Sequence, residues 1–368
     1  MIAEALALNA RISRALDALP PADPMTLASP DGFGETQVRR IIERECADSP
    51  EALRARLLSE YFDAGPIEAL LSDPLVTEII ANGPEQIWCE REGRLERLEE
   101  RFLSALTYRN FLSRVSREAG VEASLECPFA DGHWRGCRTH LAIPPAASGA
   151  AVLTIRKHPP LPWTFTTLSE RGWASGEAML VLRGLVANKK NFLIVGSTGS
   201  GKTSVLNACL GAVGASERTM IIEDTPELSV PNAASAKLLT RRDPHRLLRD
   251  IDQGELLKQA LRMRPDRIVM GEIRGGEAKD LLMAFATGHT GCMGTLHADS
   301  PRQALLRLEM LIQLGAPQWA VHAVRTLIWL SVQAVVVVSR SPCGARRLEG
   351  IYEIASLEDL GFLIEKKA

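Results

Sequence analysis

The stretch from Asn191 to Asn207, NFLIVGSTGSGKTSVLN, decides how the second half of the chain folds. Residues 192–195 are apolar and partly β-branched, which predicts a short buried strand. The segment GSTGSGKT at 196–203 follows at once and matches the phosphate-loop pattern G-x-x-x-x-G-K-[ST] at every fixed position. Residues 204–210 then have the character of a helix. We therefore expect a strand, a phosphate-binding loop and a helix in direct succession.

The residue types in this loop suit the binding of a nucleoside triphosphate. Its glycines let the backbone adopt conformations that a Cβ atom would forbid, so that successive N–H groups turn inward at the start of a helix and form an anion site. Lys202 can reach the β- and γ-phosphates, and the Thr203 hydroxyl can bind Mg²⁺. The predicted nucleotide-binding residues of the loop are Gly196, Ser197, Thr198, Gly199, Ser200, Gly201, Lys202, Thr203 and Ser204.

The composition of the whole chain is that of a globular protein with no electrostatic preference for nucleic acid. It has 368 residues, 46% of them hydrophobic and 24% charged, and a net charge of -2. The seven cysteines include no C-x-x-C pair, and their odd number without a secretory signal predicts a reducing cytoplasm. The longest apolar stretch, residues 326–338, is shorter than the roughly 20 residues that span a bilayer.

Changes in sequence character divide the chain into four parts. Residues 1–62 have apolar positions at helical spacing and predict a helical N-terminal segment. Residues 63–158 combine strand-like runs with an amphipathic helix, which predicts a small α+β domain with an antiparallel sheet. A proline-rich linker is expected at 159–168. Residues 169–368 predict an α/β domain with a parallel sheet.

The elements expected before the phosphate loop follow from local patterns and turn residues. The expected helices are 2–19, 35–46, 49–62 and 106–119, with a Pro- and Gly-rich linker at 20–34. The expected strands are 76–80, 86–90, 139–143 and 152–155.

Three further segments follow the phosphate loop: IIEDTPEL at 221–228, LRMRPDRIVMGEIRGGE at 261–277 and TGHTGCMGTLH at 287–297. This series resembles that of the secretion traffic ATPases, which serve type II and type IV secretion, pilus assembly and conjugation. It is most similar to the Tad/Flp pilus assembly (CpaF-like) and type IV secretion branch. The resemblance covers residues 63–355 and implies that the α/β domain is a RecA-like P-loop NTPase.

Two glutamates at strand ends are the expected catalytic acids. Acids at the carboxyl ends of strands beside a phosphate loop are well placed to support Mg²⁺ or to align a water with the γ-phosphate. Glu223 and Glu272 both occupy such positions. The resemblance implies that Glu223 orients or activates the water, and that Glu272 supports Mg²⁺ through water. Exchange of the two roles stays open, as does a purely structural strand-end acid.

The resemblance also implies roles for two histidines and one arginine. His289 and His297 lie in a Gly-rich loop without the i, i+4 spacing of helical metal ligands. They are expected near the γ-phosphate or a subunit boundary, where they would sense the nucleotide; a hydrogen-bonded structural histidine is the alternative. One arginine finger is expected to neutralise phosphate charge, with a surface salt bridge as the alternative for each candidate. The candidates are Arg156, Arg241, Arg242 and Arg262.

The resulting prediction is an ATPase that uses ATP and Mg²⁺ to drive a secretion or pilus assembly system. The resemblance implies a cytoplasmic homohexameric ring on the inner face of the inner membrane. Hydrolysis would rotate the domains and move an inner-membrane platform, with no direct nucleic-acid partner. The alternatives are a nucleotide-binding regulator or scaffold without turnover, and a nucleic-acid translocase with a RecA-like core. The cargo (pilin, effector or DNA) stays open.

Overall fold

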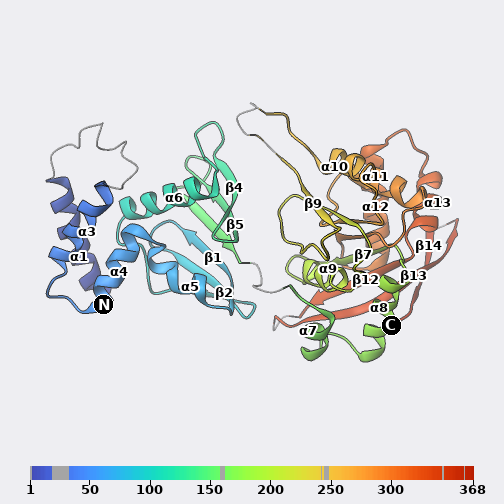
Figure 1. The fold of residues 1–368 in the computed structure, drawn as a ribbon, viewed down its shortest axis with the longest axis horizontal. Helices are drawn as coiled ribbons and strands as arrows, with labels where there is room; N and C mark the ends of the chain where they lie inside the picture. The colour runs from blue at the N-terminus through green and yellow to red at the C-terminus, as the bar shows by residue number, and fades with distance from the viewer. Residues whose placement is uncertain are drawn as a thin grey trace. The chain divides into compact units, whose positions relative to one another are not determined.

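The computed structural model describes residues 2–18, 33–157, 162–241, 243, 248–341, 344–359 and 361–368. The chain forms two compact units, Met1–His158 and Pro159–Ala368 (Figure 1). Most of the first predicted linker, residues 159–161 of the second, and the candidate Arg242 lie outside the described residues.

Three helices begin the first unit: α1 (Ile2–Asp17), α3 (Phe33–Glu45) and α4 (Glu51–Phe62). They confirm the three helices predicted there. Their apolar faces meet in a core that includes Ile12, Ile42 and Leu57, each fully buried. Leu103 belongs to the same core, and the buried Glu60 carboxylate accepts the Leu103 N–H at 2.7 Å. The predicted helical segment and the α+β part are therefore packed together in one unit.

A six-stranded antiparallel sheet makes up the rest of the first unit, in the order β3-β2-β1-β6-β5-β4. The strands are β1 (Val76–Asn82), β2 (Ile87–Arg91), β3 (Arg94–Arg97), β4 (Phe129–Trp134), β5 (Cys137–Ala142) and β6 (Val152–Arg156). The helices beside it are η1 (Gly65–Ile67), α5 (Glu68–Ser72) and α6 (Ala105–Ala119). The antiparallel sheet was predicted, but β3 and β4 were not. β3 is exposed along its length and β4 contains Asp and Gly, so neither has a strand-like apolar pattern.

An eight-stranded sheet runs through the second unit in the order β14-β13-β12-β7-β11-β10-β8-β9. The parallel strands are β7 (Phe192–Gly196), β8 (Thr219–Glu223), β9 (Ala236–Leu239), β10 (Arg267–Met270), β11 (Met293–His297) and β12 (Ala334–Arg340). The last two strands, β13 (Arg346–Glu358) and β14 (Gly361–Lys366), are antiparallel. The sheet is therefore mixed, whereas a parallel sheet was predicted. Short connections join β12, β13 and β14, and these suit antiparallel neighbours.

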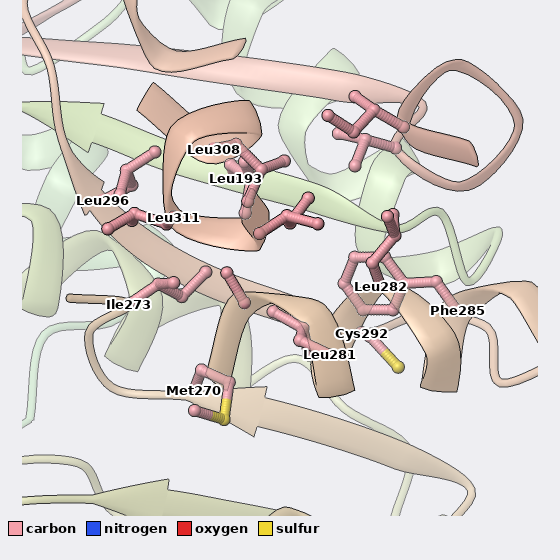
Figure 2. Packing of buried hydrophobic residues seen from close by; sticks show 14 of the residues in the cluster. Leu193, Met270, Ile273, Leu281, Leu282, Phe285, Cys292, Leu296, Leu308 and Leu311 are labelled. Carbon is pink, nitrogen blue, oxygen red and sulfur yellow. The ribbon is translucent and has the colours of Figure 1, made fainter. Parts of the chain in front are cut away.

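Helices cover both faces of this sheet, and successive residues of β7 point into different cores. Leu193 and Val195 face the core formed with α10 (Gln253–Ala260), α11 (Glu277–Ala286), α12 (Pro301–Gly315) and α13 (Val321–Ser331). Figure 2 shows Leu193 on that side, among labelled residues of α11 and α12. Phe192 and Ile194 face the core formed with α7 (Phe165–Glu170), α8 (Gly176–Ala187) and α9 (Lys202–Leu210). Burial on both faces explains why β7 is a continuous apolar run.

The structure of this unit refines two expectations from the sequence, the extent of the 159–168 linker and the structure of the apolar stretch 326–338. The second half of the predicted 159–168 linker is helical, because Thr164 caps α7 by accepting the Thr167 N–H at 3.1 Å. The apolar stretch 326–338 is divided between the end of α13 and β12. In the described portions of the chain, none of the helices is both long and apolar enough to cross a membrane.

Candidate phosphate-binding and hydrolysis site

The carboxyl ends of three neighbouring strands define the candidate site. β11 pairs in parallel with β7 on one side and β10 on the other. Parallel strands bring their carboxyl ends to the same edge of the sheet, where ligands bind in open α/β folds. The phosphate loop leaves β7 there, His297 ends β11, and Glu272 lies two residues beyond β10.

The phosphate loop has the backbone conformation that its glycines predict. Gly199 and Gly201 adopt positive φ angles of 72° and 96°. A Cβ on Gly196 would lie 2.3 Å from the Val338 carbonyl oxygen, so this position can only be glycine. The loop ends at α9, whose first turn contains Thr203 and Ser204. These features place a glycine-rich loop at a helix N-terminus, the arrangement that binds phosphate.

Lys202 and His297 are in contact at this edge of the sheet. The Lys202 side chain is largely buried, and its Nζ donates to the carbonyl oxygens of Gly196 at 3.0 Å and Ser197 at 2.9 Å. The same Nζ lies 3.3 Å from His297 Nδ1. The ammonium is thus held beside the loop.

His297 in turn connects Lys202 to Glu272. His297 Nε2 lies 3.0 Å from Glu272 Oε1. Burial and the nearby Lys202 charge lower the pKa of His297, so its imidazole is neutral at pH 7. A neutral ring with its proton on Nε2 satisfies both contacts, because Nδ1 then accepts from Lys202 while Nε2–H donates to Glu272. The three side chains form a continuous series from the phosphate loop to the carboxylate.

Glu272 is ionised and partly exposed. Burial raises its pKa, but the Arg274 guanidinium and the other basic groups nearby, Lys202 among them, together outweigh burial, and the pKa of Glu272 lies below its ordinary value. Arg274 Nη2 donates to Glu272 Oε2 at 2.6 Å. About a fifth of the Glu272 side chain, 22%, remains accessible. An accessible carboxylate beside a phosphate loop can accept a hydrogen bond from a water.

Glu223 has different surroundings at the end of β8. Glu223 is 3% exposed, and its Oε1 accepts hydrogen bonds from the N–H groups of Glu227 at 3.1 Å and Leu228 at 3.0 Å. Lys237 forms an ion pair with Oε2 at 3.2 Å. Burial raises the pKa of Glu223, and Lys237 offsets part of that rise. Because β11 and β10 separate β8 from β7, roughly 14 Å of sheet lies between Glu223's strand and the strand that carries the loop.

His289 and Arg262 lie at the opposite edge of the sheet. His289 precedes β11, its Nδ1 is 3.1 Å from the Ala284 carbonyl oxygen, and its own carbonyl oxygen accepts from Asn191, the residue before β7. Arg262 is exposed and precedes β10. Within its own chain neither residue lies beside the phosphate loop, because a five-residue strand carries its ends about 16 Å apart. Roles at a subunit boundary stay predictions.

The other two arginine candidates that the structure describes lie in different units of the chain. Arg241 donates from Nη2 to the Arg249 carbonyl oxygen at 2.8 Å. Arg156 is exposed at the end of β6 in the first unit, in register with Glu78 on β1 and Arg138 on β5. Its role at the nucleotide stays a prediction.

Three arginines beside the site were missed in the sequence. Arg274 follows Glu272 by two residues, and its place just beyond a strand-end acid could have marked it. Arg346 donates from Nε to the Gly199 carbonyl oxygen at 2.9 Å, and Arg340 approaches the same glycine. The Arg346 contact joins residues 147 positions apart, so no local pattern could have revealed it.

Comparison with known proteins adds the family. A model described as type II/IV secretion system protein matches residues 60–349. A Mycobacterium tuberculosis protein (strain ATCC 25618 / H37Rv), provisionally named as a conjugal transfer protein, is 34% identical over 309 residues, 82% of this chain and 87% of that protein. The type IV secretion system protein PtlH of Bordetella pertussis is 32% identical over 323 residues, 81% of this chain and 95% of its own.

A solved structure supports the fold alone. The ATPase DotB of Legionella pneumophila matches with a TM-score of 0.56 and 19% identity, over 76% of both chains.

Proposed function

The chain belongs to the type II/IV secretion system protein family and is a secretion-system ATPase, and we propose that it works as a homohexameric ring whose chemistry is centred on Lys202, His297 and Glu272. The observation that carries the proposed site is the unbroken series of contacts, Lys202 Nζ to His297 Nδ1 at 3.3 Å and His297 Nε2 to Glu272 Oε1 at 3.0 Å. The series runs from the phosphate loop to an ionised acid.

Each member of the series has a separate task in this proposal. The N–H groups of the loop and α9 bind the phosphates, and Lys202 exchanges its contacts with two loop carbonyls for contacts with phosphate oxygens. Glu272 accepts a hydrogen bond from the attacking water and aligns it with the γ-phosphate. His297 holds the Glu272 carboxylate and reports, through Lys202, whether phosphate is present.

The residues present also suit Mg²⁺. This ion prefers oxygen ligands, keeps several waters and is commonly bound through one or two protein groups together with substrate phosphates. The Thr203 hydroxyl, in the first turn of α9, and the accessible Glu272 carboxylate, acting through water, would hold it. The ion would neutralise charge that develops on the phosphates.

Glu223 is the second acid, and its proposed role follows from the burial of its side chain. Two backbone N–H groups and Lys237 engage its carboxylate. We therefore propose that Glu272 takes both roles that the sequence divided between the two acids, alignment of the water and support of Mg²⁺. Glu223 supports the site by fixing residues 223–228 beside β10, where its Cγ would lie 2.8 Å from a Cβ placed on Gly271.

The partners proposed here follow from the family and its named relatives. Homologues are named for type IV secretion and conjugal transfer, which supports association with secretion machinery. We propose that the ring lies at the cytoplasmic face of the inner membrane and contacts a membrane-embedded platform. Movement of the two units of each chain, driven by hydrolysis, would be passed to that platform. A place in the Tad/Flp pilus branch remains a proposal of the same kind.

The ring can be tested by light scattering on the full chain. With Mg²⁺ and a non-hydrolysable ATP analogue, we expect a mass near six times the chain mass of 40.2 kDa. Nucleotide occupancy should stabilise the ring, so Lys202→Ala, which removes the phosphate-binding ammonium, should abolish the effect of the analogue. A wild-type monomer under every condition would contradict the proposed ring.

A further inference from the structure

Two arginines from the C-terminal part of the sheet lie against the phosphate loop. Arg340 ends β12 and Arg346 begins β13, and the two face each other in the antiparallel ladder. The Nε of Arg346 donates to the Gly199 carbonyl oxygen at 2.9 Å. A Cβ placed on Gly199 would lie 3.1 Å from Arg340 Nη1, and one placed on Gly201 would lie 3.2 Å from Arg346 Cδ.

The same pair of strands supports the loop at its beginning. A Cβ on Gly196 would lie 2.3 Å from the Val338 carbonyl oxygen of β12. The β12–β13 ladder therefore contacts the loop at its first glycine and again around its apex. The arginines belong to this support and approach the loop at Gly199 and Gly201.

The Arg346 contact acts on one peptide group of the loop. In an anion-binding loop the N–H groups point inward, so a carbonyl held on the outside fixes the orientation of its peptide plane. The peptide between Gly199 and Ser200 is held at both ends, because its N–H donates to the Ser197 carbonyl oxygen at 3.3 Å while its carbonyl accepts from Arg346. Glycine at positive φ has little preference of its own for this orientation.

We propose that Arg346 is a positioning residue that holds the phosphate loop in its anion-binding form, with Arg340 adding positive charge beside Gly199. This inference rests on the proposed function, in which the loop binds ATP. It assigns a nucleotide-binding role to the β12–β13 hairpin, which lies outside every motif recognised in the sequence. A charge-assisted hydrogen bond to a carbonyl contributes more than a neutral one, so its loss should weaken phosphate binding measurably.

The test uses Arg346→Gln in the full chain and two ligands, MgATP and magnesium tripolyphosphate, titrated by calorimetry. Tripolyphosphate carries the phosphates without base or ribose. Arg346→Gln should weaken both ligands by the same factor, about tenfold. KM for ATP should rise by a similar factor while kcat changes less than about threefold. Arg346→Lys, which keeps a charged donor, should restore part of the affinity.

The neighbouring Arg347 provides the matched control. It is 63% exposed and bonds Glu349 instead of the loop, so Arg347→Gln should bind both ligands as the wild type does. If Arg346→Gln binds both ligands within about twofold of the wild type, the positioning role is overturned. If it loses ATP affinity but keeps tripolyphosphate affinity, Arg346 contacts base or ribose and the proposal is also overturned. A wild-type chain that bound neither ligand would instead overturn the proposed function.

Discussion

Replacing Glu272 with glutamine is expected to slow ATP turnover by at least about 100-fold while nucleotide affinity stays within a few-fold of the wild type. The amide keeps the size of the side chain but cannot hold an attacking water as a carboxylate does. His297 Nε2–H can still donate to the amide oxygen, whereas the amide N–H₂ cannot accept from Arg274, so one of the two contacts of this side chain is lost. Phosphate release and nucleotide titration on the same preparation measure the two effects separately.

The matched control for this variant is Glu365→Gln on the edge strand β14. Glu365 is about half exposed and pairs with Lys367, away from the phosphate loop. Its replacement should leave turnover unchanged. Wild-type turnover in Glu272→Gln, together with a large loss in Glu223→Gln, would reverse the assignment of the two acids.

Replacing Arg267 with methionine should destabilise the ATPase unit by about 3–5 kcal/mol, because it leaves a buried charge network without its centre. Arg267 is 1% exposed, with Nε and Nη2 bonded to Glu217 at 2.8 and 3.2 Å. Its Nη2 also donates to the Val186 carbonyl oxygen at 3.0 Å. Chemical unfolding at pH 7 measures the loss. The control is Arg249→Met, since Arg249 is 76% exposed and its pair with Glu255 should contribute no more than about 1 kcal/mol.

The loss of stability in Arg267→Met should become smaller as the pH falls. Hydrogen bonds from Arg267, the larger contribution, and from Lys189 lower the pKa of Glu217 from 4.5 to about 2. A carboxylate with a lowered folded-state pKa stabilises the fold fully above its unfolded pKa, and this contribution is lost as the pH falls toward the folded value. The stability gap between wild type and Arg267→Met should therefore narrow between pH 4.5 and about 2. A gap that widened over this range would contradict the assignment.

The phosphate loop could be predicted because everything that specifies it is contiguous. Residues 192–195 form a strand from their own apolar pattern, the glycines supply the positive φ angles, and α9 follows within the same stretch. Glu272 was predicted to be at a strand end for the same local reason. Its contact with His297 depends on the order β7-β11-β10, which no local pattern contains.

Residues that are close in sequence are not always close in space in this unit. His289 and His297 belong to one Gly-rich motif, yet β11 runs between them and carries them to opposite edges of the sheet. Arg262 is separated from Glu272 by β10 in the same way. Conversely, Arg346 reaches Gly199 only because β12 pairs with both β7 and β13, and that pairing is a property of the whole sheet.

The most direct test of the hydrolysis site is steady-state phosphate release by the full wild-type chain with MgATP, run beside Lys202→Ala. Lys202 joins the phosphate loop to His297, so we expect repeated turnover in the wild type and no turnover above background in the variant. Nucleotide binding without phosphate release in the wild type, or equal release by both chains, would contradict the proposed site.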